Sequence, residues 1–244
     1  MNLQQLLYKV NITKVVGTTH IELSDVACDS RKIKESFLFV AIKGTQSDGH
    51  SYIQQAIKIG ATVIVLEDMP ADLDKNITYV QVVDSNIALG IIAANFYDNP
   101  SEKIKLVGIT GTNGKTTVVS LLSQLFGMLN IKVGMLSTIQ NKIIDTIIPS
   151  THTTADSLQI NYLLNEMIKQ GCEYCFMEVS SHGIDQDRVD GLHFAIAAFL
   201  NLTMDHLDYH ESAERYFQTK CRLFNGSAGP PPGTVVLNRD DPYG

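Results

Sequence analysis

The segment that most restricts the possible folds of this chain is Leu106–Thr117, which reads LVGITGTNGKTT. An apolar run, Lys105–Ile109, leads into it and predicts a buried strand. The segment that follows has apolar residues at helical spacing, namely Val118, Leu121, Leu122, Leu125 and Leu129. A glycine-rich turn between a strand and a helix is the setting that a phosphate-binding loop requires.

The residue types within this turn suit phosphate binding. Gly111 and Gly114 permit a tight turn, so that successive backbone N–H groups and the helix N-terminus can face an anion. Lys115 would add a positive charge near the terminal phosphates, and the Thr116 hydroxyl suits Mg²⁺. Ile109 stands where the standard pattern has glycine, and the alternative is a glycine-rich turn that carries Gly-Lys-Thr by chance.

Apolar runs alternate with helix-period segments along the chain, which predicts α/β layers with largely parallel sheets. We expect strands at 37–42, 62–66, 78–83, 105–109, 133–137, 174–179, 194–200 and 234–238. We expect helices at 52–59, 87–97, 115–129, 157–169 and 213–224.

The turn-forming stretch Asp98–Ser101 marks a domain boundary. We therefore expect a small N-terminal α/β domain over residues 1–99 and a Rossmann-like P-loop domain over residues 100–244. The last residues, Asn238–Gly244, resemble a turn that leads into a further element, which predicts that the second domain is truncated.

Composition excludes several classes of protein. The net charge of −7 argues against a general nucleic-acid binder, because affinity for the phosphate backbone requires a basic surface. The sequence has no run of about 18 apolar residues and no signal-peptide pattern at its start, so we expect no membrane span and a cytoplasmic location. The four cysteines are sparse and irregularly spaced, which indicates reduced thiols.

Cys172 and Cys175 form a C-x-x-C pair that could indicate a metal site or a redox disulfide. The segment Tyr174–Val179 predicts a buried strand, and residues three apart in a strand point to opposite faces. We therefore favour a core role for both thiols.

Two motifs follow apolar strands of the expected P-loop domain. In Met177–Gly183, Glu178 lies at the carboxyl end of a strand, where it could complete a Mg²⁺ shell or merely cap the next turn. In Asn201–His210, Asp205 and His206 arrive at the same edge of the sheet. Because Mg²⁺ prefers oxygen ligands, this second motif by itself suggests zinc as readily, or a solvated polar turn.

Taken together, these motifs resemble the Mur ligases, the ATP-dependent amino-acid ligases of peptidoglycan synthesis. The resemblance covers essentially all 244 residues and depends on Asp29-Ser30-Arg31, Leu38–Ala41, Asp48-Gly49-His50, Gly111–Thr117, Met177–Gly183 with Gln186 and Arg188, and Asp205–His210. Within the family the chain is most similar to the UDP-N-acetylmuramoyl-tripeptide synthetases. These add meso-diaminopimelate or L-lysine to UDP-MurNAc-L-Ala-D-Glu through an acyl phosphate.

The resemblance implies a role for each matching residue. ATP would contact Gly111, Thr112, Asn113, Gly114, Lys115, Thr116 and Thr117. The UDP-linked substrate would contact Ser30, Thr45, Gln46, Ser47, Thr153, Thr154, Ser180, Gln186 and Arg188. Magnesium would bind Thr116, Glu178, His206 and a carbamylated Lys220, and the catalytic residues would be Lys115, His206 and Lys220. Composition alone instead predicts that Lys220 is an ordinary exposed helix lysine.

The implied ligands are ATP, Mg²⁺, the UDP-linked dipeptide and an amino acid, and we expect a monomer. From the resemblance we expect that these 244 residues do not include the family's third domain, which binds the amino acid. One alternative is therefore a module that binds substrate and nucleotide without catalysing the reaction. Another is a different P-loop enzyme, such as a folylpolyglutamate synthase-like ligase or a nucleotide kinase, neither of which needs the leading segment Asp29–Val40.

Overall fold

A computed structural model of the chain describes residues 1–44, 47–150, 152–203, 205 and 207–244. The chain forms two compact units, Met1–Asp98 and Asn99–Gly244. The boundary lies one residue before the predicted one. Asp98 and Asn99 both have left-handed backbones (φ +59° and +50°), and Pro100 begins the next helix, so local turn chemistry ends the first unit.

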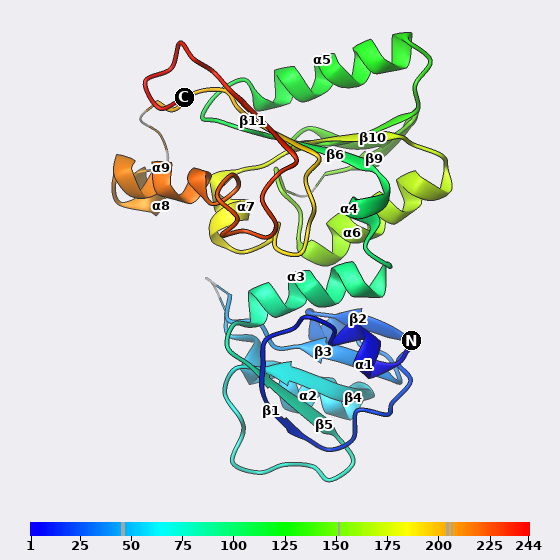
Figure 1. Ribbon diagram of the computed structural model, residues 1–244. Coiled ribbons are helices and arrows are strands. Elements are labelled where there is room, and N and C mark those ends of the chain that lie inside the picture. Colours follow the sequence, from blue (N-terminus) through cyan, green and yellow to red (C-terminus); the bar gives the residue numbers. More distant parts are fainter. Residues whose placement is uncertain (45–46, 151, 204, 206) are drawn as a thin grey trace. The chain divides into compact units, whose positions relative to one another are not determined.

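The first unit is a five-stranded sheet with helices on its faces (Figure 1). Its elements are α1 Leu3–Leu6, β1 Ile12–Val16, β2 Asp25–Ala27, the 3₁₀ helix η1 Ser30–Lys32, β3 Phe37–Val40, the 3₁₀ helix η2 Gly49–Tyr52, α2 Ile53–Ile59, β4 Ala61–Leu66, β5 Thr78–Val82 and α3 Ser85–Phe96. The strand order is β1-β5-β4-β3-β2, and only the β1–β5 pair is antiparallel among these strands. One face of β3 and β4 packs with α2 through Phe39, Ile64 and Ala56.

The second unit is a seven-stranded sheet whose five adjacent strands β12-β11-β6-β10-β7 are parallel. Its elements are α4 Pro100–Lys103, β6 Lys105–Thr110, α5 Lys115–Met128, β7 Val133–Leu136, β8 Gln140–Ile143, β9 Thr146–Pro149, α6 Ser157–Lys169, β10 Tyr174–Glu178, α7 Ser181–Asp185, β11 Ile196–Phe199, α8 Leu207–His210, α9 Ala213–Cys221 and β12 Thr234–Leu237. The antiparallel strands β8 and β9 extend the sheet beyond β7. Because β10 and β11 flank β6 on opposite sides, the strand order reverses at β6, where such sheets bind ligands.

The sheet of this unit lies between two layers of helices (Figure 1). Successive side chains of its central strands point to opposite faces, so each strand packs with both layers. Val107 of β6 and Phe176 of β10 pack with Val119 of α5. Leu106 and Met177, their neighbours, pack on the other face with residues of α6. The sheet is therefore covered on both faces, as a parallel sheet requires.

Cys172 and Cys175 lie on the same face of the sheet, so the prediction that they point to opposite faces is wrong. Cys172 precedes β10 instead of belonging to it, and it packs in the same apolar cluster as Cys175. Both thiols are free and buried, and burial raises the pKa of each. A core role for both remains the better interpretation.

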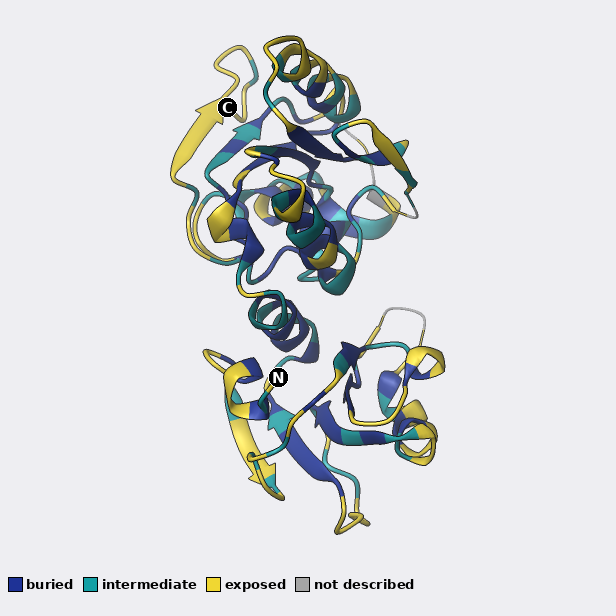
Figure 2. Cartoon of the chain, turned by 90° about the vertical axis from the view of Figure 1, so that its right-hand side faces the viewer, coloured by how far each residue is buried: buried dark blue, intermediate teal, exposed yellow. Residues whose placement is uncertain are grey.

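Each expected strand and helix has a counterpart in the structure, with ends that differ by a few residues. The sequence did not predict β1, β2, β8 and β9, nor the short helices α1, α4, α7 and α8. Strand β12 has all four residues exposed at the edge of its sheet (Figure 2). In the described ranges, none of the helices combines the length and apolar character that a membrane crossing needs.

Candidate functional site: a phosphate loop and the pocket beside it

The predicted phosphate loop joins β6 to α5 and has the backbone that its glycines allow. Gly111 and Gly114 have φ of +148° and +86°, in the region that side chains other than glycine rarely adopt. A Cβ atom on Gly111 would lie 3.0 Å from the Cβ of Leu200, so the loop also packs closely against the segment after β11. Helix α5 begins directly at Lys115, and its first N–H groups therefore lie at the loop.

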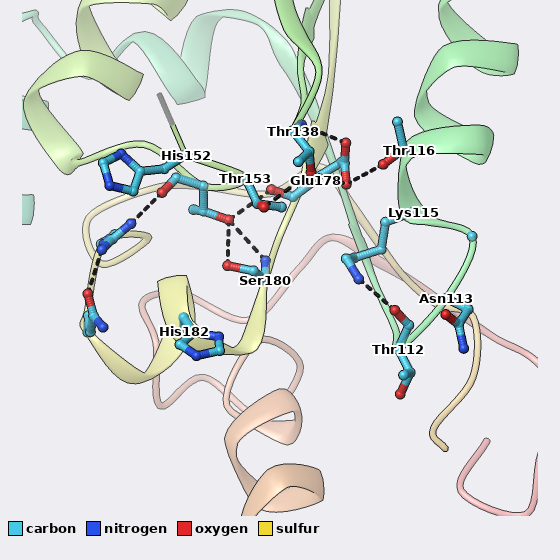
Figure 3. Close-up of a pocket in the computed structure, with 14 residues that line it drawn as sticks. Thr112, Asn113, Lys115, Thr116, Thr138, His152, Thr153, Glu178, Ser180 and His182 are labelled. Atoms are coloured by element: carbon cyan, nitrogen blue, oxygen red, sulfur yellow. Dashed lines mark hydrogen bonds between the residues drawn. The ribbon is translucent and has the colours of Figure 1, made fainter. Parts of the chain in front are cut away.

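Lys115 folds back over this loop. Its Nζ donates hydrogen bonds to the backbone oxygens of Gly111 (2.8 Å) and Thr112 (2.9 Å), as Figure 3 shows for Thr112. Burial lowers the pKa of Lys115, and the carboxylates of Glu178 and Asp205 oppose that shift. The ammonium is thus held at the loop by carbonyl oxygens, which an anion could replace as partners.

Glu178 is buried at the carboxyl end of β10 and accepts hydrogen bonds from two sides (Figure 3). The Thr116 hydroxyl donates to Oε2 (2.9 Å). The backbone N–H of Thr138 donates to Oε1 (2.8 Å), and the Thr138 hydroxyl donates to Oε2 (3.1 Å). The predicted convergence of Glu178 with the loop is therefore observed, and a role in capping its own following turn is not.

A pocket of about 480 Å³ lies beside the loop (Figure 3). It is lined by Thr112, Asn113, Gly114, Lys115, Thr116, Thr138, His152, Thr153, Thr154, Glu178, Ser180, His182, Gln186 and Arg188. All five predicted substrate residues of this unit thus line the same pocket as the loop. Gly111 and Thr117 do not line it, and Thr117 is exposed.

The substrate side of this pocket is tied together by Thr154. Its hydroxyl donates to the backbone oxygen of Glu178 (3.1 Å) and accepts from the backbone N–H of Ser180 (2.9 Å). Its own backbone oxygen accepts from Arg188 Nη1 (2.7 Å). Gly183 permits this packing, since a Cβ atom there would lie 2.6 Å from the Thr154 side chain. Burial lowers the pKa of Arg188.

Lys220 is not the exposed helix lysine that composition predicts. Only 1% of the residue is exposed, because α9 packs its Nζ 3.2 Å from the oxygen of Gly111 and 3.4 Å from Thr110 Oγ1. Burial, with a further contribution from the charge of Lys115, lowers the pKa of Lys220 to about 7. The amine of Lys220 therefore reaches the same Gly111 oxygen as Lys115, and a pKa near 7 leaves part of it uncharged at neutral pH.

Three predicted residues, His206, Thr45 and Gln46, lie outside the described residues. Asp205, next to His206, is exposed, and its charge offsets part of the lowering of the pKa of Lys115 and of Lys220. Across the parts of the chain that are described, no three His, Cys, Asp or Glu side chains gather in a group that could hold a metal.

The first unit has a pocket of its own, of about 460 Å³, which includes Ser30 and Ser47. Two 3₁₀ turns form its walls. Asp29 caps η1 by accepting from the N–H of Arg31 (3.0 Å), and Asp48 caps η2 by accepting from the N–H of His50 (2.9 Å). The two predicted substrate serines of this unit therefore line one pocket.

Thr138, His152 and His182 also line the pocket of the second unit, although the sequence analysis gave them no role. Thr138 belongs to no motif. It follows the parallel strand β7, so the rule that ligands bind at the carboxyl ends of such strands could have pointed to it. His182 stands within the motif Met177–Gly183 that was recognised for Glu178.

The residues present fit a nucleoside triphosphate with Mg²⁺. The glycine turn and the start of α5 offer backbone N–H groups to phosphate oxygens. The hydroxyl of Thr116 and the carboxylate of Glu178 are adjacent oxygen donors, the type that Mg²⁺ prefers.

Comparison with known proteins agrees with this geometry. Residues 109–244 match the family model "Mur ligase middle domain", and residues 22–97 match "Mur ligase family, catalytic domain". Among solved structures, one described as UDP-N-acetylmuramoyl-L-alanyl-D-glutamate–2,6-diaminopimelate ligase superposes with a TM-score of 0.80 at 26% identity, covering 100% of this chain and 48% of that one. MurF from Acinetobacter baumannii shares the fold, with a TM-score of 0.66 at 21% identity, covering 99% and 49%.

Curated relatives align along the whole chain. The UDP-N-acetylmuramoyl-L-alanyl-D-glutamate–2,6-diaminopimelate ligases of Cytophaga hutchinsonii and Bacteroides fragilis are each 47% identical to it, covering 100% of this chain and 50% of the relative. The chain thus spans about half the length of the curated relatives it matches. Because the middle-domain model alone matches more than half of its residues, the chain belongs to the Mur ligase family.

Proposed function

We propose that this chain supplies the UDP-substrate site and the ATP site of an amide ligase. The reaction joins 2,6-diaminopimelate to UDP-N-acetylmuramoyl-L-alanyl-D-glutamate in peptidoglycan synthesis. The observation that carries the proposal is the single pocket where the phosphate loop, Glu178 and the threonine–arginine cluster meet. The names of the full-alignment relatives favour diaminopimelate over L-lysine as the amino acid.

The pocket of the second unit suits phosphorylation of a carboxylate. A carboxylate is a poor electrophile, and transfer of a phosphoryl group from ATP gives an acyl phosphate with a good leaving group, which the amine of the amino acid then displaces. Lys115 and the N-terminus of α5 would stabilise negative charge on the transferring phosphoryl group. Arg188, with Thr153, Thr154, Ser180 and Gln186, would hold the anionic peptide of the substrate.

Magnesium would be held by Thr116 and Glu178, with His206 as a further ligand, and would neutralise phosphate charge. Lys220 would act after carbamylation, in which its amine adds to CO₂ and releases one proton. Only the uncharged amine is nucleophilic, so the low pKa of Lys220 favours this step near neutral pH. In the first unit, Ser30 and Ser47, together with Thr45 and Gln46 outside the described residues, would hold the UDP moiety.

Phosphate release tests the reaction. The full-length polypeptide that contains these residues is incubated with ATP, Mg²⁺ and UDP-MurNAc-L-Ala-D-Glu, with either 2,6-diaminopimelate or L-lysine. We expect release that requires both substrates and is faster with diaminopimelate. Absence of substrate-dependent release would refute the ligase, and faster release with L-lysine would refute the choice of amino acid.

A second candidate, a binding module without catalysis, applies to the 244 residues taken by themselves. It is favoured because the chain covers about half of its relatives while both pockets lie within it. Titration calorimetry of the chain with UDP-MurNAc-L-Ala-D-Glu tests this candidate. Heat of binding without phosphate release supports it, and absence of heat at high micromolar ligand contradicts it.

A further inference from the structure

We propose that Tyr209 is a positioning residue for substrate binding, because its hydroxyl fixes the orientation of Gln186 and, through it, of Arg188. Tyr209 lies in α8, directly after the segment that contains His206. The inference rests on the proposed function, in which Gln186 and Arg188 contact the UDP-linked peptide. It adds a residue that does not itself line the pocket.

Three hydrogen bonds run in one direction from a cation to an anion. Arg188 Nη2 donates to Gln186 Oε1 (2.6 Å), and Gln186 Nε2 donates to the hydroxyl of Tyr209 (3.2 Å). The Tyr209 hydroxyl in turn donates to Asp185 Oδ2 (2.9 Å). Hydrogen bonds in such a chain polarise one another, so each link strengthens the next.

The single proton of the Tyr209 hydroxyl decides which way the amide faces. Because that proton goes to the carboxylate of Asp185, the hydroxyl presents only a lone pair to Gln186. Gln186 must then turn its NH₂ group toward Tyr209 and its carbonyl oxygen toward Arg188. Without the hydroxyl, the amide can rotate, and the guanidinium loses an oriented acceptor.

The two neutral links also preserve the charge of Arg188 for a ligand. In the described contacts of Arg188, Nη1 donates to the Thr154 backbone oxygen and Nη2 to Gln186, whereas Asp185 is reached only through Gln186 and Tyr209. A guanidinium has five N–H donors, so others remain for an anionic group in the pocket that Arg188 lines. A direct ion pair with Asp185 would instead neutralise the group that the substrate needs.

The aromatic ring of Tyr209 is held independently of its hydroxyl. Its centroid lies 4.1 Å from that of His182, which lines the pocket, and 4.8 Å from that of His210. Tyr209→Phe therefore removes the hydrogen bonds and keeps the ring contacts. Tyr8→Phe is the matched control, because Tyr8 is 63% exposed in the first unit and its ring contact with Lys9 is retained by phenylalanine.

Titration calorimetry on the chain, with UDP-MurNAc-L-Ala-D-Glu and separately with ATP and Mg²⁺, tests the inference. We expect Tyr209→Phe to weaken binding of the UDP-linked dipeptide about tenfold and to change the affinity for ATP by less than about twofold, as for a lost charge-assisted hydrogen bond. Tyr8→Phe should change neither affinity. A merely structural role would weaken both ligands together and lower the unfolding midpoint.

Asp185→Asn provides the second test, and it replaces the first if Tyr209→Phe does not fold. Asparagine can donate as well as accept, so the direction of the chain is no longer fixed. We expect weaker binding of the dipeptide, and no additional loss when Asp185→Asn is combined with Tyr209→Phe. Unchanged dipeptide affinity in Tyr209→Phe, or additive losses, would overturn the inference. Failure of the unsubstituted chain to bind the dipeptide would refute the proposed function itself.

Discussion

The pockets of the two units differ in where their charged groups lie. In the second unit, Glu178 and Lys220 are each 1% exposed, and their partners come from distant parts of the chain. Lys220 and Gly111, whose atoms meet, are 109 residues apart in sequence. In the first unit, the side chain of Arg31 is 83% exposed, and its partner Asp29 is two residues away.

This contrast separates a site built by tertiary packing from one built by local turns. Buried ions persist only when neighbouring groups replace water, so the second unit must hold Glu178 and Lys220 in a defined arrangement. The exposed pair in the first unit stays hydrated, and its turn depends mainly on the backbone capping by Asp29. Removing the buried Glu178 should therefore cost stability in the second pocket, whereas removing the exposed Arg31 should cost little in the first.

The largest expected effect is that of Glu178→Ala. It leaves the N–H of Thr138 and the hydroxyl of Thr116 without their acceptor. It also removes an anion that offsets the charge of Lys115. We expect the free energy of unfolding to fall by about 3 kcal/mol, as is typical when hydrogen bonds to a buried charged group are lost. Urea denaturation of the chain measures this loss.

Glu178→Gln is the matched control, because it keeps the shape and an acceptor oxygen but not the charge. It should lose less stability than Glu178→Ala and still abolish the Mg²⁺ dependence of nucleotide binding. If Glu178→Ala were as stable as the original chain, the claim that buried charged groups stabilise the second pocket would be wrong.

The second effect is a pH dependence from Lys220. Its pKa is lowered from 10.5 to about 7 in the folded chain, so between these values the unfolded chain binds more protons and stability rises with pH. Lys220→Met removes this slope. We expect the variant to exceed the original chain in stability by on the order of a few kcal/mol at and below pH 7, with a difference that vanishes near pH 10.5.

Denaturation at a series of pH values in CO₂-free buffer measures the difference, since carbamylation would replace the titrating amine. Lys132→Met, at a lysine exposed to solvent, is a control that should show no such slope. A constant difference between Lys220→Met and the original chain across pH 7 to 10 would mean that the amine is not desolvated.

Sequence patterns predicted the framework of both units because it is encoded locally. The parallel strands have continuous apolar runs, and the loop at Gly111–Thr117 stands between one such run and a helix. The missed hairpin β8–β9 turns at Ile144, which has φ of +54°. A β-branched residue is not expected at such a backbone, so turn chemistry could not reveal this hairpin.

Residues of the pocket could be predicted where a sequence motif follows a strand. They could not be predicted where tertiary packing determines which side chain reaches the site. Glu178 was found because it ends a buried strand. Thr138 was missed because a threonine after a strand carries no signature of its own, and the burial of Lys220 depends on how α9 packs against β6 and its loop. Family resemblance, and not the local pattern, singled out Lys220.

The smallest expected effect is that of Arg31→Ala in the first pocket. Arg31 forms a bidentate contact with Asp29 (Nη2 to Oδ2, 2.8 Å), but both groups remain hydrated, and salt screens them. We expect an unchanged unfolding midpoint. Because the side-chain hydrogen bond from Arg31 is the largest cause of the lowered pKa of Asp29, that pKa should rise toward its ordinary value, as NMR titration can follow.

Comparing the stabilities of Arg31→Ala and Asp29→Ala decides whether the capped turn or the exposed ion pair stabilises the first pocket. The capping bond from the Arg31 N–H to Asp29 is a backbone contact, so it survives in Arg31→Ala and is lost in Asp29→Ala. Asp29→Ala should therefore destabilise the first unit by about 1 kcal/mol, a normal value for a lost cap, while Arg31→Ala does not. Equal destabilisation by both would show that the exposed ion pair holds this pocket as firmly as buried charges hold the other.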